Sequence, residues 1–536
     1  MIEIFSQNPE ARARLRNFAR SIFLTGFAFL AAVVTSCTTV GVDYARPGVS
    51  VPNAWTMSVQ PHVENEAACL QEWWKAFQDP ALNTLISRAR CDSPDVSIAI
   101  QRIVEARAQR GVALSALFPA IDANGAYTRT GQSARVGPAA FGPTNPIDVF
   151  SLGTAAAWEI DVFGGLCRQV EAADANIEVS VEEYRDLLVT LFAEVALNYI
   201  DYRTFEERVR VARQNIVIQN DSLSLAESRL EAGLVSKIDV TQAEANLQTT
   251  RATVPQLEGQ LVAARNRLAT LTGGYPHSVD SILKKHRSIP IPKKNFAMGA
   301  PADLLRARPD IRSAERNLAV AVAQIGVTES ELYPKFSLMG DLTLQASDIS
   351  SLLDSAAAGY SFGPSFRWNL FRSGQIKNLI RVDEARAMQA YAAYEKSVLV
   401  AVEEVETSMV AVTTELERRT ALRRAVSSSA EAVELVKSNY TEGLVDFQRV
   451  IDSQRVKFQN EDLDVISRGQ IARNYVGLYR ALGGGAALEE VTLPAIDKKP
   501  GGGWIKKRPA PYAKIPAKKD EVEAELAGEG EAAKEE

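Results

Sequence analysis

The sequence predicts an α+β membrane protein made of two related halves, each with a long helical hairpin and two amphipathic β-strands. Three observations support this fold class. Motifs of the first half recur about 210 residues later, apolar residues repeat every seven positions, and four segments alternate between apolar and polar residues. A duplicated, elongated chain is therefore expected in place of the two or three globular domains that 536 residues would ordinarily form.

The internal two-fold repeat is visible in matched motifs. Pro94-Asp95-Val96 recurs 215 residues later as Pro309-Asp310-Ile311, and Gly233-Leu234-Val235 recurs at a shift of 210 as Gly443-Leu444-Val445. These matches predict the domain organisation of the chain. The expected order is a first repeat, a linker, a second repeat and a disordered tail rich in Lys, Pro, Gly and acidic residues, at 80–275, 276–299, 300–485 and 486–536.

Each half contains a long helix of the coiled-coil type. In the first half every seventh residue is apolar, namely Val181, Leu188, Val195, Tyr202, Val209, Ile216, Leu223 and Leu230. The same register in the second half holds Tyr391, Val398, Val405, Val412, Arg419, Val426, Val433 and Tyr440. Such spacing is typical of a left-handed coiled coil, which Arg419 interrupts once. No Pro or Gly occurs within 168–232, so this helix would be about 100 Å long.

Matched residues turn each long helix back into a hairpin. Gly233 and Gly443 suit the left-handed conformation that follows a helix C-terminus. Ser236 begins a capping-box pattern for the first returning helix, and Asp446 can cap the second. Pro255 predicts a kink or overwinding of the first returning helix.

Four segments alternate in the manner of strands in a sheet with one apolar and one polar face. They lie at 121–128, 150–162, 336–345 and 360–370. Their length of about ten residues and their aromatic ends favour a membrane barrel over a half-buried soluble sheet. Because four strands cannot close a barrel, and hydrocarbon does not tolerate an open edge, more than one chain must contribute. The loops 131–147 and 346–357 would then face outside the cell.

The N-terminus has the pattern of a bacterial lipoprotein signal peptide over residues 1–36. Arginines precede the uncharged stretch Ser21–Ser36, which is short of the roughly 20 residues of a membrane-spanning helix. Cys37 follows at the position where lipoproteins are cleaved and acylated, so we expect a covalent lipid there. Ordinary cleavage, with Cys37 as a bystander, is the alternative. An N-terminal segment, residues 37–79, would join this anchor to the first repeat.

The composition points away from nucleic-acid binding and catalysis. The net charge is −6, whereas a nucleic-acid binder is ordinarily basic. Three histidines and four cysteines offer few metal ligands, and we expect no cofactor. Cys69 and Cys91 form either a disulfide or two separate buried thiols, and Cys167 has no obvious partner. A G-x-S-x-G pattern around Ser361 lacks the later histidine that a hydrolase needs, so no enzyme is expected.

Several longer motifs carry a family resemblance. These are WWKAFQDPAL at 73–82, WEIDVFGG at 158–165, RLEAGLVSKIDV at 229–240 and RARPDIRSAERNLAVAVAQIGVTESELYPKFSL at 306–338. They resemble the TolC-like outer membrane factors over nearly the whole mature chain. CTTVGVDYARPGVSVPNAW, at 37–55, resembles the NodT/OprM-type lipoprotein branch of that family.

The resemblance implies a homotrimer whose chains each give four strands to one 12-stranded outer-membrane β-barrel, embedded in outer-membrane lipid. A long periplasmic α-helical coiled-coil barrel would continue it. It also implies an exit channel that passively conducts small molecules, such as drugs or toxic compounds, from an inner-membrane pump and a periplasmic adaptor. The pump would be of the resistance-nodulation-division class. The alternatives are the exit duct of a type I protein-secretion system and a purely structural trimeric stalk. The cargo is not revealed by the sequence.

The resemblance also places a periplasmic aperture on the second hairpin. The family closes this end with aspartates and a network around a tyrosine, which match Asp452 and Tyr440. Arg449 stands where some relatives have another aspartate, and it could relieve the repulsion among the Asp452 carboxylates that a trimer would crowd into a narrow lumen. We hypothesise that Asp446, Arg449 and Asp452 set the closed aperture together with Tyr440. Asp446 could instead be only a helix cap, and Tyr440 could be only a packing residue of the seam.

Docking to an adaptor is predicted for the two hairpin tips. The residues concerned are Gly233, Leu234, Val235, Ser236, Gly443, Leu444 and Val445. Leu234 and Leu444 would be exposed apolar residues at a projecting end, which fits docking. Turn geometry alone is the other explanation for these tips.

Overall fold

The structure is a computed structural model that describes residues 39–48, 55, 70–131, 146–292 and 307–486. The predicted signal peptide, Cys37, Cys69, most of the loop 131–147 and the predicted tail lie outside the described residues. The chain divides into two compact units. The first comprises the described parts of Met1–Pro47, Glu105–Glu178 and Glu315–Ala393, and the second comprises the described parts of Gly48–Val104, Val179–Ala314 and Tyr394–Glu536.

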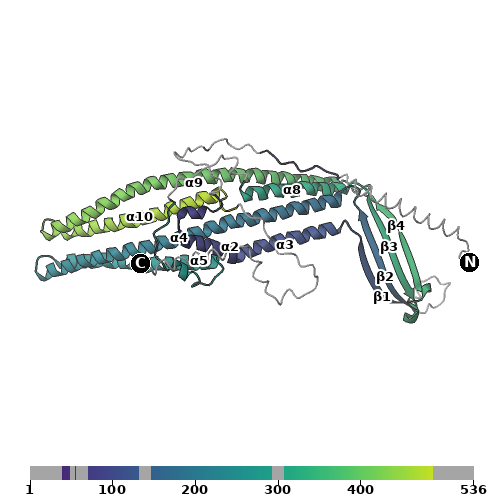
Figure 1. The fold of residues 1–536 in the computed structure, drawn as a ribbon, viewed down its shortest axis with the longest axis horizontal. Coiled ribbons are helices and arrows are strands. Elements are labelled where there is room, and N and C mark those ends of the chain that lie inside the picture. The colour runs from purple at the N-terminus through teal and green to yellow at the C-terminus, as the bar shows by residue number, and fades with distance from the viewer. Residues whose placement is uncertain (1–38, 49–54, 56–69, 132–145, 293–306, 487–536) are drawn as a thin grey trace, which may run out of the picture. The chain divides into compact units, whose positions relative to one another are not determined.

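The first unit contains a four-stranded antiparallel sheet in the order β1-β2-β3-β4 (Figure 1). The strands are β1 (Ala120–Thr130), β2 (Ile147–Ile160), β3 (Lys335–Ala346) and β4 (Ala358–Arg367). All four predicted strands are confirmed, although the last ends before Trp368 and Leu370. Within the described chain, β1 and β4 each have one unpaired edge.

Apolar side chains of the sheet remain exposed in the single chain. They include Ile121, Leu342, Tyr360, Phe362 and Phe366, of which Phe362 is 82% exposed. Two short helical turns, η5 (Ile349–Ser351) and η6 (Ser355–Ala357), join β3 to β4. Exposure of so many large apolar residues on one sheet indicates a surface that another molecule or a lipid phase covers.

The two halves of the chain contain equivalent hydrogen bonds between a tryptophan at one end of the sheet and the segment that precedes the first strand of that half. The indole Nε1 of Trp158 donates a hydrogen bond to the carbonyl oxygen of Leu117 at 2.9 Å. Its counterpart, Trp368, donates to Leu332 at 3.0 Å. Each tryptophan therefore fastens the end of its strand to the segment that precedes the first strand of its half.

The helices recur at the two shifts that the motifs predict. The pair α3 (Pro94–Ser115) and α8 (Pro309–Ser330) differ by 215 residues and have 22 residues each. The long helices α4 (Gly165–Glu231) and α9 (Gln375–Thr441) have 67 residues each, and the returning helices α5 (Lys237–Leu271) and α10 (Phe447–Ala481) have 35 each, both pairs at a shift of 210. The short helices are η3 (Trp73–Phe77), α2 (Pro80–Asp92) and α6 (Asp280–Leu283).

The predicted coiled-coil seam is confirmed in both long helices. Every seam position from Val181 to Leu230 and from Tyr391 to Tyr440 is buried or partly buried. Arg419, the one charged seam residue, is also partly buried. The helix α5 continues through Pro255 to Leu271. None of the helices in the described part of the chain is both long enough and apolar enough to span a membrane.

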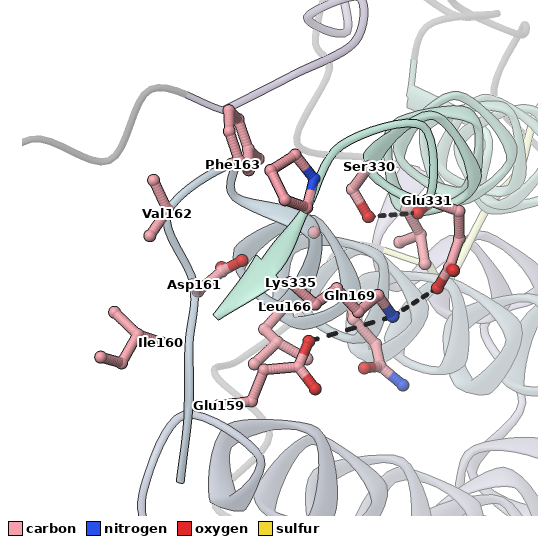
Figure 2. A pocket seen from close by; sticks show the side chains of 13 residues that line it. Glu159, Ile160, Asp161, Val162, Phe163, Leu166, Gln169, Ser330, Glu331 and Lys335 are labelled. Atoms are coloured by element: carbon pink, nitrogen blue, oxygen red, sulfur yellow. Dashed lines mark hydrogen bonds and ion pairs between the residues drawn. The ribbon is translucent and has the colours of Figure 1, made fainter. Parts of the chain in front are cut away.

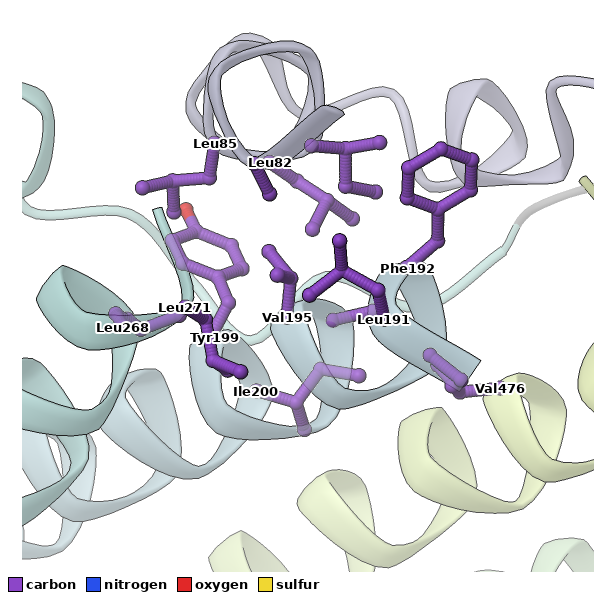
Figure 3. Packing of buried hydrophobic residues seen from close by; sticks show 14 of the residues in the cluster. Leu82, Leu85, Leu191, Phe192, Val195, Tyr199, Ile200, Leu268, Leu271 and Val476 are labelled. Carbon is purple, nitrogen blue, oxygen red and sulfur yellow. The ribbon is translucent and has the colours of Figure 1, made fainter. Parts of the chain in front are cut away.

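The main hydrophobic core lies in the second unit, where α2, α4, α5 and α10 meet (Figure 3). Figure 3 shows Leu82 and Leu85 of α2 facing Val195 and Tyr199 of α4. Trp73, which is 1% exposed, stacks on Tyr479 of α10 with ring centroids 5.1 Å apart. This core fixes the ends of both hairpins that lie away from their tips.

Candidate aperture at the hairpin tips

The two hairpin turns are built as the sequence predicts. Gly233 and Gly443 adopt φ values of +72° and +78°, in the left-handed region that favours glycine. Ser236 caps α5 by accepting a hydrogen bond from the amide of Ile238 at 3.2 Å. Asp446 caps α10 by accepting one from the amide of Arg449, also at 3.2 Å. Asp446 is therefore a helix cap, and its role in an aperture remains a prediction.

A small cluster of buried residues joins the two tips within the second unit. We call it the tip cluster, and its members are Ala226 of α4, Ala243 of α5, Tyr440 of α9, and Phe447, Val450 and Ile451 of α10. Val235 and Val445, which were predicted to dock an adaptor, pack against this cluster. Leu234 and Leu444, at 68% and 69% exposed, point away from it into solvent. The tips therefore divide into buried valines and exposed leucines.

Tyr440 is buried in the tip cluster and is held by a residue of the other hairpin. Its ring centroid lies 5.1 Å from that of Phe447. The guanidinium of Arg229, on α4, lies 4.5 Å from the centre of the Tyr440 ring. Its Nη1 donates a hydrogen bond to the Tyr440 carbonyl oxygen at 2.5 Å. Tyr440 is thus both a packing residue of the seam and one of the residues that link the two hairpins.

Burial also affects the chemistry of Tyr440. The hydroxyl is buried and has no hydrogen-bond partner among the described residues. Burial raises the pKa of this phenol above its ordinary value, so Tyr440 is neutral at physiological pH. The charge in this link therefore comes from Arg229 alone.

Asp452 and Arg449 lie apart from the tip cluster, on the exposed side of α10. The Asp452 side chain is 55% exposed and accepts a hydrogen bond from Gln448 Nε2 at 3.0 Å. Its ion-pair partner is Arg455, at 3.9 Å, and not the predicted Arg449. Within the single chain, Arg455, one turn further along the same face, is therefore the residue that pairs with Asp452, and the role of Arg449 among the copies of a trimer stays a prediction.

A row of polar contacts, which we call the polar ladder, connects α4 of the first hairpin to α10 of the second along their length away from the tips. Four residues of α4, each seven positions from the next, contact α10. The contacts are Ser222 with Gln454 at 2.6 Å, Asn215 with Glu461 at 2.7 Å, Arg208 with Asp462 at 2.7 and 3.0 Å, and Asp201 with Arg473 at 2.8 Å. Arg229, which links to Tyr440, occupies the next step of the same register. The hairpins are therefore joined along this face by hydrogen bonds and ion pairs, in addition to the apolar tip cluster.

Glu207 strengthens the ladder beside Arg208. Hydrogen bonds from Arg210 and Arg468 lower the pKa of its carboxyl group to about 2. Glu207 therefore stays ionised at any pH above this value and keeps Arg468 of α10 in contact with α4.

Sequence reasoning found Tyr440 and the glycine turns but missed Arg229 and the polar ladder. The heptad pattern of α4 is defined by its apolar positions, and Arg229 and the polar ladder lie outside it. The position directly before each seam residue from Tyr202 to Leu230 is polar, and this polar row is the available signal in the sequence: Asp201, Arg208, Asn215, Ser222 and Arg229. It could not name partners, because those lie more than 200 residues away in the chain.

A cavity of about 160 Å³ lies in the first unit where the sheet meets the helices (Figure 2). Lys335 lies between Glu159 and Glu331, as Figure 2 shows. Its Nζ is 3.9 Å from Glu159 Oε1. Asp161 accepts a hydrogen bond from the amide of Cys167 at 2.7 Å. Lys335 thus pairs with both glutamates and Asp161 is bound by a backbone amide, and no group of side chains in the described residues is arranged to hold a metal ion. The cavity therefore offers no evident reactive group, and Ser361 of the G-x-S-x-G pattern lies within β4.

Comparison with known proteins agrees with this architecture. The model of the family described as Outer membrane efflux protein matches residues 85–274 and 300–484. Nodulation protein T of Rhizobium leguminosarum bv. viciae is 29% identical over 476 residues, which cover 88% of this chain and 95% of that protein. The pyoverdine export outer membrane protein OpmQ of Pseudomonas aeruginosa is 28% identical, with 85% of this chain and 96% of that protein covered.

Solved structures share the fold. The outer-membrane channel OprN superposes with a TM-score of 0.75 and 33% sequence identity, covering 83% of this chain and 99% of that one. CusC superposes with a TM-score of 0.72 and 25% identity, covering 83% and 100%. Since the family model matches both halves of the chain, the protein is a member of the outer membrane efflux protein family and is located in the outer membrane.

Proposed function

We propose that the protein is the outer-membrane exit channel of a tripartite efflux system and conducts small molecules passively. The observation that carries this proposal is the sheet with two unpaired edges and an exposed apolar surface. In lipid, each edge requires a partner, and the apolar surface is favoured there. Three copies would give 12 strands, enough for a closed barrel. A periplasmic adaptor and an inner-membrane pump, of the resistance-nodulation-division class, would complete the system.

The relatives support efflux over protein secretion. One is named as a pyoverdine export protein of Pseudomonas aeruginosa, and another, from Escherichia coli K12, as the cation efflux system protein CusC, with 27% identity. Their names describe small cargoes of different chemistry. We infer that this chain likewise transports small molecules or ions and performs no catalysis.

The aperture of this channel would lie at the hairpin tips. Asp452 is exposed on α10 and would occur three times around a trimer axis. Carboxylates that face a narrow lumen repel each other and attract cations. Asp446 would contribute as the cap that fixes the start of α10, and Arg449 would add an exposed charge beside it. Tyr440 would hold the second hairpin to the first through Arg229.

Replacing Asp452 with alanine tests both the channel and its aperture. We expect the purified full chain to form pores in planar lipid bilayers, and Asp452→Ala to change their conductance and lower their preference for cations, because up to three charges leave the constriction. Glu442→Ala, which removes an exposed carboxylate near the same tip, is the matched control. The absence of pores would contradict the channel, whereas pores with unchanged conductance would contradict only the aperture.

The exposed leucines of the tips are proposed to dock the adaptor. Leu234 and Leu444 occupy equivalent positions in the two turns and expose apolar side chains that nothing in the described chain covers. Gly233, Ser236 and Gly443 would shape these turns, while Val235 and Val445 anchor them to the tip cluster. Leu234→Asp with Leu444→Asp should abolish cross-linking to the adaptor without loss of pore formation. Undiminished cross-linking would show that docking occurs elsewhere.

We also propose that Cys37 carries a lipid. Thr39, two residues later, lies against Gly164 at the start of α4, where a Cβ atom on the glycine would come within 2.6 Å of the Thr39 Cα. Thr39 is thus held beside the base of the sheet, and a lipid on Cys37, two residues earlier in the sequence, would enter the membrane there. The intact mass of the mature protein checks this, since an unmodified N-terminus would exclude the lipid.

A further inference from the structure

The two hairpins differ at one level in the composition of their seams. In the first hairpin this level holds Phe205 and Val209 of α4 and Val254 and Leu257 of α5. A shift of 210 residues leads to Glu415 and Arg419 of α9 and Asp464 and Ser467 of α10. Four apolar residues in one hairpin therefore correspond to four polar or charged residues in the other.

In the first hairpin these residues form a small apolar core. Val209 and Leu257 are 8% and 5% exposed, and they pack with Ala212, which is fully buried. Phe205 and Val254 pack against the same core, as does Phe458 of α10. Close packing of this kind resists bending of a hairpin, because any opening would expose apolar surface to water.

The second hairpin has a polar junction in the same place. The Ser467 hydroxyl, in a fully buried residue, donates a hydrogen bond to Glu415 Oε1 at 2.5 Å. Arg419 Nε lies 3.9 Å from Asp464 Oδ1, and both atoms are buried without a hydrogen-bond partner among the described residues. Buried polar atoms that lack a hydrogen bond destabilise the closed packing relative to a form in which water reaches them.

A neighbouring contact differs in the same direction. In the first hairpin, Arg213 of α4 and Glu258 of α5 form an ion pair at 2.7 Å. Their counterparts in the second hairpin are Arg423 and Arg468, which carry the same charge. Burial, together with the charges of Arg468 and Arg423, lowers the pKa of Arg419. The ion pair that crosses the first hairpin at this level therefore has no equivalent in the second, where Arg468 pairs with Asp464 of its own helix at 3.2 Å and with Glu207 of α4 at 3.1 Å.

We propose that Glu415, Arg419, Asp464 and Ser467 form a hinge at which the tip-side part of the second hairpin bends, while the first hairpin stays rigid. About 22 residues of α9 separate Arg419 from the tip, a length of roughly 33 Å. A bend of about 10° would therefore move the tip by roughly 6 Å, enough to break the contact of Tyr440 with Arg229. A role of this bend in gating rests on the channel function proposed above. The bend itself is inferred from the seam residues and does not depend on that function.

Hydrogen–deuterium exchange of the purified full-length protein tests the hinge directly. The segments to compare are 210–228 of α4 and 420–438 of α9, which are equivalent in the repeat and contain no proline. We expect amides of the α9 segment to exchange about tenfold faster than those of the α4 segment. Equal rates in the two segments would overturn the proposal.

A graft of the first seam onto the second provides the matched variant. Glu415→Phe, Arg419→Val, Asp464→Val and Ser467→Leu together should slow exchange over 420–438 to the level of 210–228. If the full graft fails to fold, the double change Arg419→Val with Asp464→Val serves in its place. It keeps the Ser467 hydrogen bond to Glu415 and should slow exchange over 420–438 in part. The reverse change in the first hairpin, Val209→Arg with Val254→Asp, should speed exchange over 210–228. Unchanged exchange in the grafted protein would contradict the hinge.

Bilayer recordings separate the hinge from the function it serves. If both proposals hold, the graft should form pores with fewer transitions to the open level. If exchange slows in the graft but its pores open normally, the hinge exists but does not gate the channel. If the unaltered protein forms no pores, the channel function is contradicted and the hinge is not.

Discussion

Replacing Arg229 with alanine should open the channel. The change removes the hydrogen bond to the Tyr440 carbonyl oxygen and the guanidinium over the Tyr440 ring. A hydrogen bond from a charged group contributes about 1.5–3 kcal/mol and a cation over a ring about 0.5–2 kcal/mol, so the closed form would lose on the order of 2–5 kcal/mol per copy. A loss of this size shifts a two-state equilibrium at least tenfold. We expect conductance in planar bilayers to rise at least about twofold.

Two variants make this result specific. Arg229→Lys keeps the charge but loses the planar guanidinium, so an intermediate conductance is expected. Asn439→Ala changes the equivalent, exposed position of the second hairpin and should leave conductance as it was. If Arg229→Ala channels stay at the closed level while still forming pores, then the link between the tips does not hold the channel closed.

Replacing Trp73 with alanine should lower the free energy of unfolding more than any other substitution considered above. Its side chain stacks on Tyr479 and meets Trp74 and Phe77 edge-on, at centroid distances of 5.9 and 6.0 Å. Gly484 leaves room for the indole, since a Cβ atom there would lie 2.8 Å from Trp73 Cδ1. Removing a buried aromatic residue costs about 3–5 kcal/mol, because the cavity left behind closes only in part.

Thermal unfolding followed by circular dichroism measures this loss. Lys75→Ala, in the same short helix but with an exposed side chain, should change stability by less than about 0.5 kcal/mol. A Trp73→Ala protein that unfolds at the same temperature as the Lys75→Ala protein would show that this core does not limit stability.

The elements of the fold could be predicted because their signals are local. A seven-residue apolar repeat identified α4 and α9 along their length, and Gly233 and Gly443 marked the turns within one or two residues. The alternation of the strands gave four segments, and the structure contains the same four in one sheet. These patterns report which face of a helix or strand is buried, and that depends on neighbouring residues only.

The candidate site was predicted less completely. Tyr440 and Asp452 came from the family resemblance, and the structure separates them into a buried cluster and an exposed helix face. Arg229 carried no signal of its own, because an arginine near a helix end is ordinarily a solvated charge. Its importance depends on the Tyr440 carbonyl oxygen, 211 positions away in the sequence.

By itself, the sequence determined the duplicated plan of this protein: its long heptad helices, its Gly-Leu-Val turns and its four amphipathic strands. Only the tertiary structure decided how the two hairpins meet, through the polar ladder from Asp201 to Ser222 and the link from Arg229 to Tyr440. It also showed that Arg419, a mere interruption of the seam in the sequence, faces Asp464. The reason is physical: periodicity records which side of a helix is buried, whereas the identity of a polar partner depends on the register between helices far apart in the chain.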